Sequence, residues 1–145
     1  MSSDVESLIA TGRIARISRD RQLINQLLEH AHLHIENAEF LVDSDDSVAA
    51  FQIAYDAVRK LCAALLVDYG LRTTSRGGHH ALFECISELS DELRIYVADL
   101  ELLRRQRNAC EYPSAAGKSP SASQIQHAVA TARDVRRIVI ELVRE

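Results

Sequence analysis

The segment from about Ser47 to Tyr69 most constrains the fold, because apolar residues cover almost every side of the helix that it predicts. A helix with so little polar surface is stable only when other elements surround it. The polar residues 43–47 can cap its start, and Gly70 is a good left-handed residue for its end. The sequence therefore predicts a central buried helix, whose apolar residues are Val48, Ala49, Phe51, Ile53, Ala54, Ala57, Val58, Leu61, Cys62, Leu65 and Leu66.

Apolar residues at spacings of three and four predict the remaining helices. These cover about residues 19–42, 79–89, 122–143 and a long stretch from Ser90 or Asp91 to about Tyr112, with polar loops at 71–78 and 113–121. Residues 1–17 have a weaker pattern, interrupted by Gly12, which indicates a short or frayed helix. We expect an all-α fold, an up-and-down bundle of four to five main helices over residues 19–145, with residues 1–18 as an N-terminal appendage.

Composition limits the classes of protein to consider. A chain of 145 residues with 47% hydrophobic residues is long enough for one domain with its own core. Its three cysteines suggest small core residues rather than a disulfide framework. The N-terminus has no signal-peptide pattern and no apolar run reaches about 18 residues, so we expect a cytoplasmic protein without a membrane span. Because the net charge is −4, binding to nucleic acid would require a local basic patch.

One basic residue interrupts an apolar stripe on the helix that ends near Tyr112. The stripe continues from Leu100 and Leu103 to Arg107 and Cys110. An arginine in that position needs a carboxylate, a phosphate or carbonyl groups, because a buried charge is costly when it is unpaired. Arg107 could pair with Glu111, four residues later, as an ordinary intrahelical contact. Alternatively, it could bind an anionic ligand.

Three motifs carry a resemblance to a known family. They are Ala54-Tyr55-Asp56-Ala57-Val58-Arg59-Lys60, Ser75-Arg76-Gly77-Gly78-His79-His80, and Arg104-Arg105-Gln106-Arg107-Asn108 followed by Glu111-Tyr112-Pro113. Together they resemble the HEPN superfamily, over about residues 20–143, and are most similar to its small stand-alone, actinobacterial-type members. That resemblance implies a helical bundle that usually forms a homodimer. It also implies a candidate metal-independent endoribonuclease of a toxin–antitoxin or phage-defence system, with a composite site at the dimer interface.

The resemblance also implies which residues form the site. Arg107 and Asn108 match the arginine and the adjacent polar residue, and an arginine can hold a scissile phosphate through two hydrogen bonds. Tyr112 occupies the place where a histidine is often found, and an unperturbed tyrosine, with a pKa near 10, is a poor base at neutral pH. Glu111 could replace that base, and so could a loop histidine. The hypothesis therefore takes Arg107, Asn108, Glu111 and Tyr112 as catalytic and takes as substrate-binding Arg104, Arg105, Arg76, His79 and His80.

Two further functions compete with the ribonuclease hypothesis. The first is a non-catalytic helical module that binds RNA or a nucleotide, or that serves as the antitoxin or scaffold for a nucleotidyltransferase-like partner. The second is a purely structural polar network at a dimer interface. We expect RNA, a second copy of the chain and a cognate antitoxin or toxin protein as partners, with no membrane. No metal or cofactor is expected, although His30 and His34 are spaced so that they could share an ion.

Overall fold

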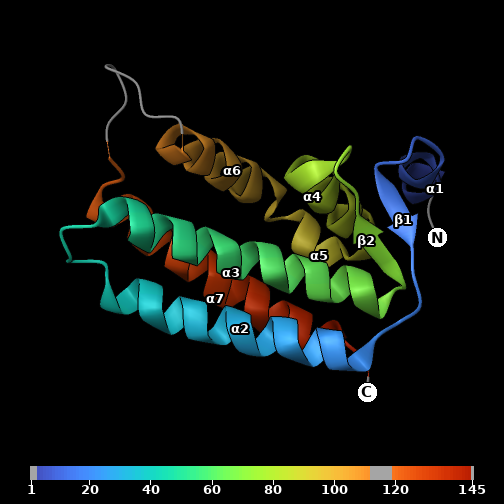
Figure 1. Cartoon of the computed structure of the whole chain (residues 1–145), viewed down its shortest axis with the longest axis horizontal. Coiled ribbons are helices and arrows are strands. Elements are labelled where there is room, and N and C mark those ends of the chain that lie inside the picture. The colour runs from blue at the N-terminus through green and yellow to red at the C-terminus, as the bar shows by residue number, and fades with distance from the viewer. Residues whose placement is uncertain (1–2, 112–118, 145) are drawn as a thin grey trace.

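The computed structural model describes residues 3–111 and 119–144, and most of them are helical. Figure 1 shows a bundle in which α2 and α7 lie along α3, while α4, α5 and α6 cover its other side. The all-α bundle predicted from the sequence is therefore confirmed. The elements in chain order are α1 Ser3–Ala10, β1 Ile14–Arg16, α2 Arg21–Phe40, α3 Ser47–Asp68, β2 Leu71–Thr73, α4 Gly78–Leu89, α5 Asp91–Arg94, α6 Val97–Glu111 and α7 Ala122–Leu142.

Helix α3 is the centre of the core, as its all-round apolar pattern predicted. It begins at the N-cap Asp46, whose carboxylate accepts a hydrogen bond from the Ala49 N–H. It ends just before Gly70, which has a φ of 71° and so supplies the left-handed conformation that the chain needs to turn into β2. Between these ends α3 is buried by α2, α7, α4 and α6 on different sides.

Helix α3 is also tied at its end to the start of α2 and the end of α7. Asp68 is 1% exposed, and its carboxylate accepts hydrogen bonds from Arg19 Nε at 2.9 Å and from the Arg144 backbone N–H at 3.3 Å. The guanidinium of Arg144 also donates to the backbone carbonyl of Asp68. Because a buried carboxylate is tolerated only when it is paired, these bonds hold three distant segments together at one end of the bundle.

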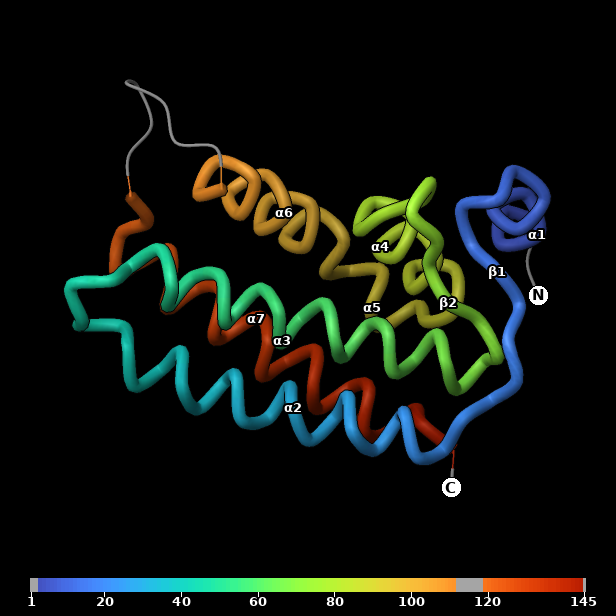
Figure 2. The backbone as a smooth tube through the Cα atoms, in the orientation of Figure 1, coloured from blue at the N-terminus to red at the C-terminus, as the bar shows by residue number. Residues whose placement is uncertain are grey.

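The long helix expected from Ser90 or Asp91 to Tyr112 is in fact two helices. Ser90 caps the single turn α5 through a hydrogen bond from the Leu93 N–H to its hydroxyl. The chain then changes direction at Ile95 and Tyr96 before α6 begins, so that α5 contacts α7 whereas α6 lies alongside α3 (Figure 2). An apolar spacing continues through such a break, because both pieces bury residues of the same stripe, so the spacing alone gave no sign of it.

The N-terminal segment and the polar stretch at 71–78 also differ from the sequence prediction. The short helix predicted within residues 1–17 is present as α1, but residues 14–16 and part of the predicted loop form a sheet. In this two-stranded antiparallel sheet of β1 and β2, Ala15 is opposite Arg72. Strands of three residues are too short to show an alternating pattern, which is why they were missed. Val5, Leu8 and Ile14 are fully buried in the same core as α3, so the segment predicted as an appendage contributes to that core.

Candidate functional site

A pocket of about 330 Å³ lies between the first turn of α4 and the second half of α6. Five of the nine residues that the sequence proposed for the site line it, although they come from two segments well separated in the chain. The lining also includes the two glycines that precede the histidines. The complete lining is Gly77, Gly78, His79, His80, Arg104, Arg107 and Asn108.

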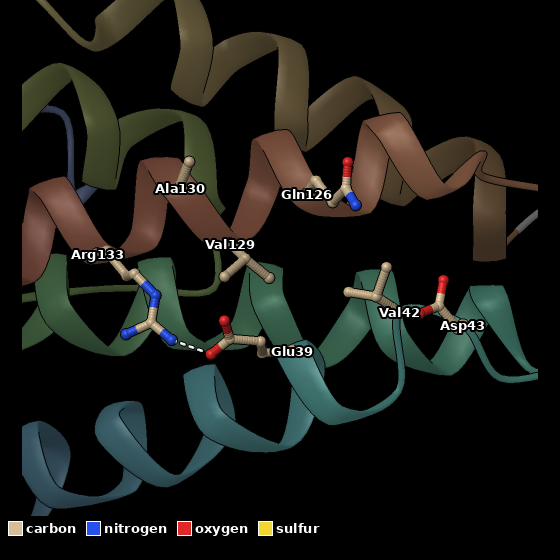
Figure 3. Close-up of a pocket in the computed structure, with 7 residues that line it drawn as sticks. All are labelled: Glu39, Val42, Asp43, Gln126, Val129, Ala130 and Arg133. Atoms are coloured by element: carbon tan, nitrogen blue, oxygen red, sulfur yellow. Dashed lines mark hydrogen bonds and ion pairs between the residues drawn. The ribbon is translucent and has the colours of Figure 1, made fainter.

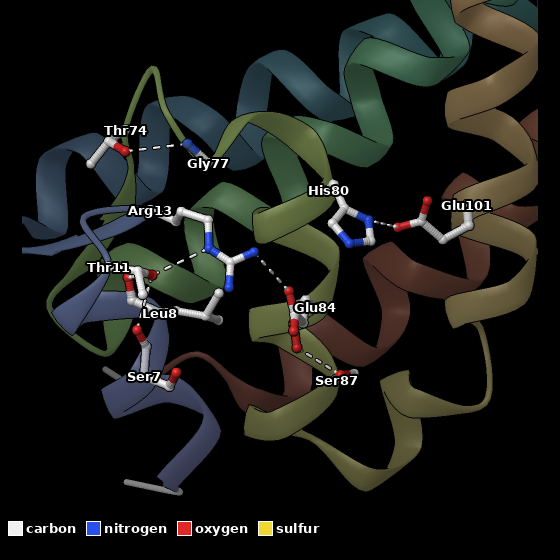
Figure 4. Close-up of polar contacts among 10 residues, drawn as sticks. All are labelled: Ser7, Leu8, Thr11, Arg13, Thr74, Gly77, His80, Glu84, Ser87 and Glu101. Atoms are coloured by element: carbon white, nitrogen blue, oxygen red, sulfur yellow. Dashed lines mark hydrogen bonds and ion pairs between the residues drawn. The ribbon is translucent and has the colours of Figure 1, made fainter.

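The N-terminal segment holds the first turn of α4 in place. The Thr74 hydroxyl donates to the Gly12 carbonyl at 2.6 Å. The Gly77 N–H in turn donates to the Thr74 carbonyl at 3.1 Å and lies 3.4 Å from the Thr74 hydroxyl oxygen (Figure 4). Gly77 also lies directly against the backbone of Arg13, so that a Cβ at this position would overlap the Arg13 carbonyl oxygen. Only glycine permits this close approach, which brings the start of α4 to its position beside α6.

His79 contacts a buried tyrosine of α3. The Oη of Tyr55 and the Nδ1 of His79 are 2.9 Å apart, and the Tyr55 side chain is fully buried. Burial lowers the pKa of His79 below its ordinary value of 6.5, and the nearby guanidiniums of Arg59 and Arg107 lower it further. The imidazole is therefore neutral at neutral pH. In the tautomer whose Nδ1–H donates to Tyr55 Oη, Nε2 is left as an acceptor for a ligand.

His80 belongs to an ionic chain that links α4 to α6. Its Nδ1 lies 2.9 Å from Glu101 Oε1, while the other oxygen of Glu101 accepts a hydrogen bond from Arg104 Nε at 2.9 Å (Figure 4). Glu101 thus connects a residue of α4 with a cation of its own helix. This contact fixes the spacing of the two walls of the pocket.

Arg107 makes the intrahelical contact that its spacing predicted. Its Nη2 lies 2.8 Å from Glu111 Oε1, and its guanidinium carbon is 5.9 Å from the centroid of the Tyr55 ring. The side chain is 27% exposed, so the guanidinium is packed on the aromatic ring but still reaches the solvent-filled pocket. Asn108, the next residue, is half-buried and lines the same pocket.

The other proposed site residues are placed differently. Glu111 reaches the site only through its pair with Arg107. Arg105 is exposed and outside the pocket lining, and Arg76 donates to the Thr11 carbonyl in the N-terminal segment. Their substrate-binding role stays a prediction without support from the pocket. Tyr112 lies outside the described residues.

Sequence reasoning did not assign a role to Tyr55 or Glu101, although both organise the pocket. Tyr55 carried a signal, because a tyrosine within an apolar helix must find a hydrogen-bond partner for its hydroxyl. The identity of that partner depends on how α3 and α4 pack, which spacing along the chain does not reveal. Glu101 carried no signal, because surface glutamates are common on helices.

A second concavity lies between the end of α2 and the start of α7, away from the proposed residues. Its volume is about 370 Å³, and Arg133 and Glu39 form an ion pair across it beside the apolar Val129 (Figure 3). Elsewhere on α2, His34 contacts Lys60 and His32 contacts Glu36.

Within residues 3–111 and 119–144, no group of three or more His, Cys, Asp or Glu side chains is arranged to hold a metal ion. None of the described helices is long and apolar enough to cross a membrane.

Comparison with known proteins adds one finding. The family model described as the HEPN domain matches residues 24–143, which include α3, α4 and α6 and therefore the whole pocket lining. No curated protein and no solved structure matches the chain.

Proposed function

We propose, since the chain belongs to the HEPN domain family, that it acts on RNA and uses the pocket between α4 and α6 as its site. The observation that carries this proposal is the meeting of a neutral, oriented imidazole with two guanidinium groups in one open pocket. Arg104 and Arg107 supply positive charge for a phosphate, and His79 supplies a group able to accept a proton. RNA offers both partners, because its 2′-hydroxyl lies beside the phosphate that it can attack.

The chemistry we propose is cleavage of RNA without a metal ion. The 2′-oxygen attacks the adjacent phosphorus while His79 Nε2 takes the hydroxyl proton, and the bond from phosphorus to the 5′-oxygen breaks. Arg107 and Arg104 stabilise the extra negative charge on the phosphoryl oxygens, and Asn108 donates a hydrogen bond to the same group. The leaving 5′-oxygen takes a proton from water. The products are a 2′,3′-cyclic phosphate and a free 5′-hydroxyl.

In this proposal His79 provides the imidazole that the sequence motif lacks at Tyr112. His79 comes from α4 rather than from the end of α6, but it lines the same pocket as Arg107. Its lowered pKa keeps it able to accept a proton at neutral pH. A tyrosine would need a strongly perturbed pKa for that role.

The resemblance also supports a second copy of the chain as a partner. We propose a homodimer in which two such pockets face each other, with a cognate antitoxin as an inhibitory partner in the cytoplasm. The exposed apolar side chains Ile95 and Leu102 of the α5–α6 face, which are 76% and 37% exposed, are consistent with a surface that a second protein covers.

A non-catalytic RNA-binding module is the second candidate function. One specific observation favours it: each arginine of the pocket already has a carboxylate partner, Glu101 for Arg104 and Glu111 for Arg107. Such pairs reduce the positive potential available to a transition state. They leave enough hydrogen-bond donors for the weaker task of holding a phosphate.

The decisive experiment is cleavage of a mixed RNA substrate in excess EDTA, followed by analysis of the product ends. We expect wild-type protein to produce 2′,3′-cyclic phosphate ends, and we expect Arg107→Ala and His79→Gln to lose cleavage while still melting cooperatively. Arg137→Ala is the matched control, because Arg137 is an exposed arginine of α7 paired with Glu92, outside the pocket lining. Binding of RNA without cleavage by folded wild-type protein would instead establish the non-catalytic module. A strong loss of thermal stability in Arg107→Ala would identify a structural role for that residue.

A further inference from the structure

One side of α3 is left uncovered between α2 and the α4–α6 pair. Figures 1 and 2 show α2 and α6 on opposite sides of α3, with α7 packed behind. Five of the partly exposed residues of α3 follow helical spacing and so form a stripe along one side of the helix. We call this the α3 stripe, and it comprises Gln52, Asp56, Arg59, Lys60 and Ala63.

The α3 stripe begins next to the pocket. Arg59 lies one helical turn beyond Tyr55, the residue that contacts His79, and on nearly the same side of α3. The guanidinium of Arg59 is close enough to lower the pKa of His79, and the guanidinium of Arg107 on α6 lowers the same pKa. Positive charge therefore reaches the same imidazole from two helices. The carboxylate partner of Arg59 is Asp56, whose Oδ1 is 3.4 Å from Arg59 Nε, and both side chains are partly open to solvent.

Lys60 extends this charge toward α2. Its Nζ lies 2.6 Å from Nε2 of His34, and both side chains are partly buried. Burial and the Lys60 ammonium lower the pKa of His34, so the imidazole is neutral and acts as the acceptor. Among the residues that the structure describes, no carboxylate lies within 4 Å of the Lys60 ammonium. A partly buried cation that rests on a neutral ring is well suited to an anionic ligand, since it keeps further N–H donors.

We infer that the α3 stripe is a second phosphate-binding subsite for the RNA strand whose reacting phosphate lies in the pocket. This inference rests on the proposed function and gives Arg59 and Lys60, which lie in one of the three motifs, a role that the resemblance did not assign to them. Arg59 and Lys60 each contact a backbone phosphate beyond the cleaved position, and His34 positions Lys60. The strand therefore runs from α6 across α3 toward α2. A single-stranded substrate suits this path, because its flexible backbone can follow the surface of one helix.

Binding should be measured by fluorescence anisotropy with an uncleavable 2′-O-methyl oligouridine and with the corresponding dinucleotide, over a range of salt concentrations. A single-stranded phosphate contact contributes about 0.7 to the slope of log K against log salt. We expect Arg59→Gln and Lys60→Gln each to lower that slope by about 0.7 for the long oligonucleotide, with dinucleotide binding unchanged. Lys60→Arg should keep the slope, and Arg137→Gln, which removes the same charge from α7, should also keep it.

The possible results separate this inference from the proposed function. If wild-type protein cleaves RNA and both α3 variants keep the wild-type slope, the inference is wrong and the proposed function stands. An equal loss of dinucleotide binding would place Arg59 and Lys60 inside the pocket and would also overturn a separate subsite. Failure of wild-type protein to bind either oligonucleotide would overturn both proposals. Thermal melting of each variant confirms that it is folded, and Arg59→Gln provides the test if Lys60→Gln does not fold.

Discussion

Replacing Tyr55 by phenylalanine tests the central contact of the proposed site. The substitution removes the hydroxyl that lies 2.9 Å from His79 Nδ1 and keeps the ring. The ring packs edge-on against Phe83 with centroids 6.2 Å apart, so no cavity should form. The loss is then that of one hydrogen bond at a buried site, about 1 kcal/mol. For a domain of this size, such a loss corresponds to a decrease in Tm of roughly 3 °C.

Tyr69→Phe is the matched control for this substitution. Tyr69 is 41% exposed, and its ring lies beneath the guanidinium of Arg144, a contact that phenylalanine keeps. Its hydroxyl has no protein partner among the described residues, so the Tm of Tyr69→Phe should stay near that of wild type. Differential scanning calorimetry of the three proteins gives the comparison. Equal Tm values for Tyr55→Phe and wild type would show that the contact between Tyr55 and His79 does not stabilise the fold.

The same substitution should also reduce cleavage of RNA, because His79 loses the partner that orients its ring. If the free energy of that contact, about 1 kcal/mol, is needed to hold the imidazole in place, kcat falls by roughly fivefold. KM should change little, since Tyr55 does not line the pocket. Full activity of Tyr55→Phe together with an inactive His79→Gln would refute the positioning role of Tyr55.

Three further predictions concern the fold around the site. Gly77→Ala should lower Tm and weaken RNA binding, because the added Cβ would overlap the Arg13 carbonyl and lie 2.8 Å from the Cβ of Ala81. Gly78→Ala is the control: its Cβ would meet open space, and because φ is 59° it should lower the free energy of unfolding by only about 1 kcal/mol. Asp68→Asn should lower the free energy of unfolding in urea by about 2 kcal/mol, which is less than the roughly 3–5 kcal/mol of fully buried pairs because its arginine partners are partly exposed. A loss below about 0.5 kcal/mol, as expected for a surface site, would contradict this. The pKa of His79 is lower in the folded than in the unfolded state, so its contribution to the free energy of unfolding should be fully present above about pH 6.5 and should be lost as the pH drops toward the folded pKa. The free energy of unfolding of His79→Gln should therefore fall less between pH 7 and pH 5 than that of wild type, and an equal fall would contradict the sign.

Periodicity predicted the parts of the fold in which each helix buries its own face. The all-round apolar pattern of α3 identified the central helix, and the three-and-four spacing of α2 and α7 identified its neighbours. The same spacing did not reveal the break at Ile95 and Tyr96. It also missed the pairing of β1 with β2, because short strands are specified by a partner that is distant in the chain.

The candidate site could be predicted only in part for the same reason. Arg107 was recognisable because an arginine on an apolar stripe needs a partner, and Glu111 was recognisable from its spacing. That His79 would lie in the same pocket was open, since it depends on where the turn at Gly77 places the start of α4. The roles of Tyr55 and Glu101 arise entirely from packing between helices.

The pairing of β1 with β2 has a consequence for the order in which the chain folds. The hairpin of α2 and α3 is local in sequence and can form early, whereas β1 must wait until both helices and the turn after α3 are in place before it meets β2. The start of α4 depends on that meeting through Gly12, Arg13 and Thr74. We therefore expect the pocket to be completed late in folding, after most of the apolar surface is buried. Intermediates that contain the helical core would then lack the site.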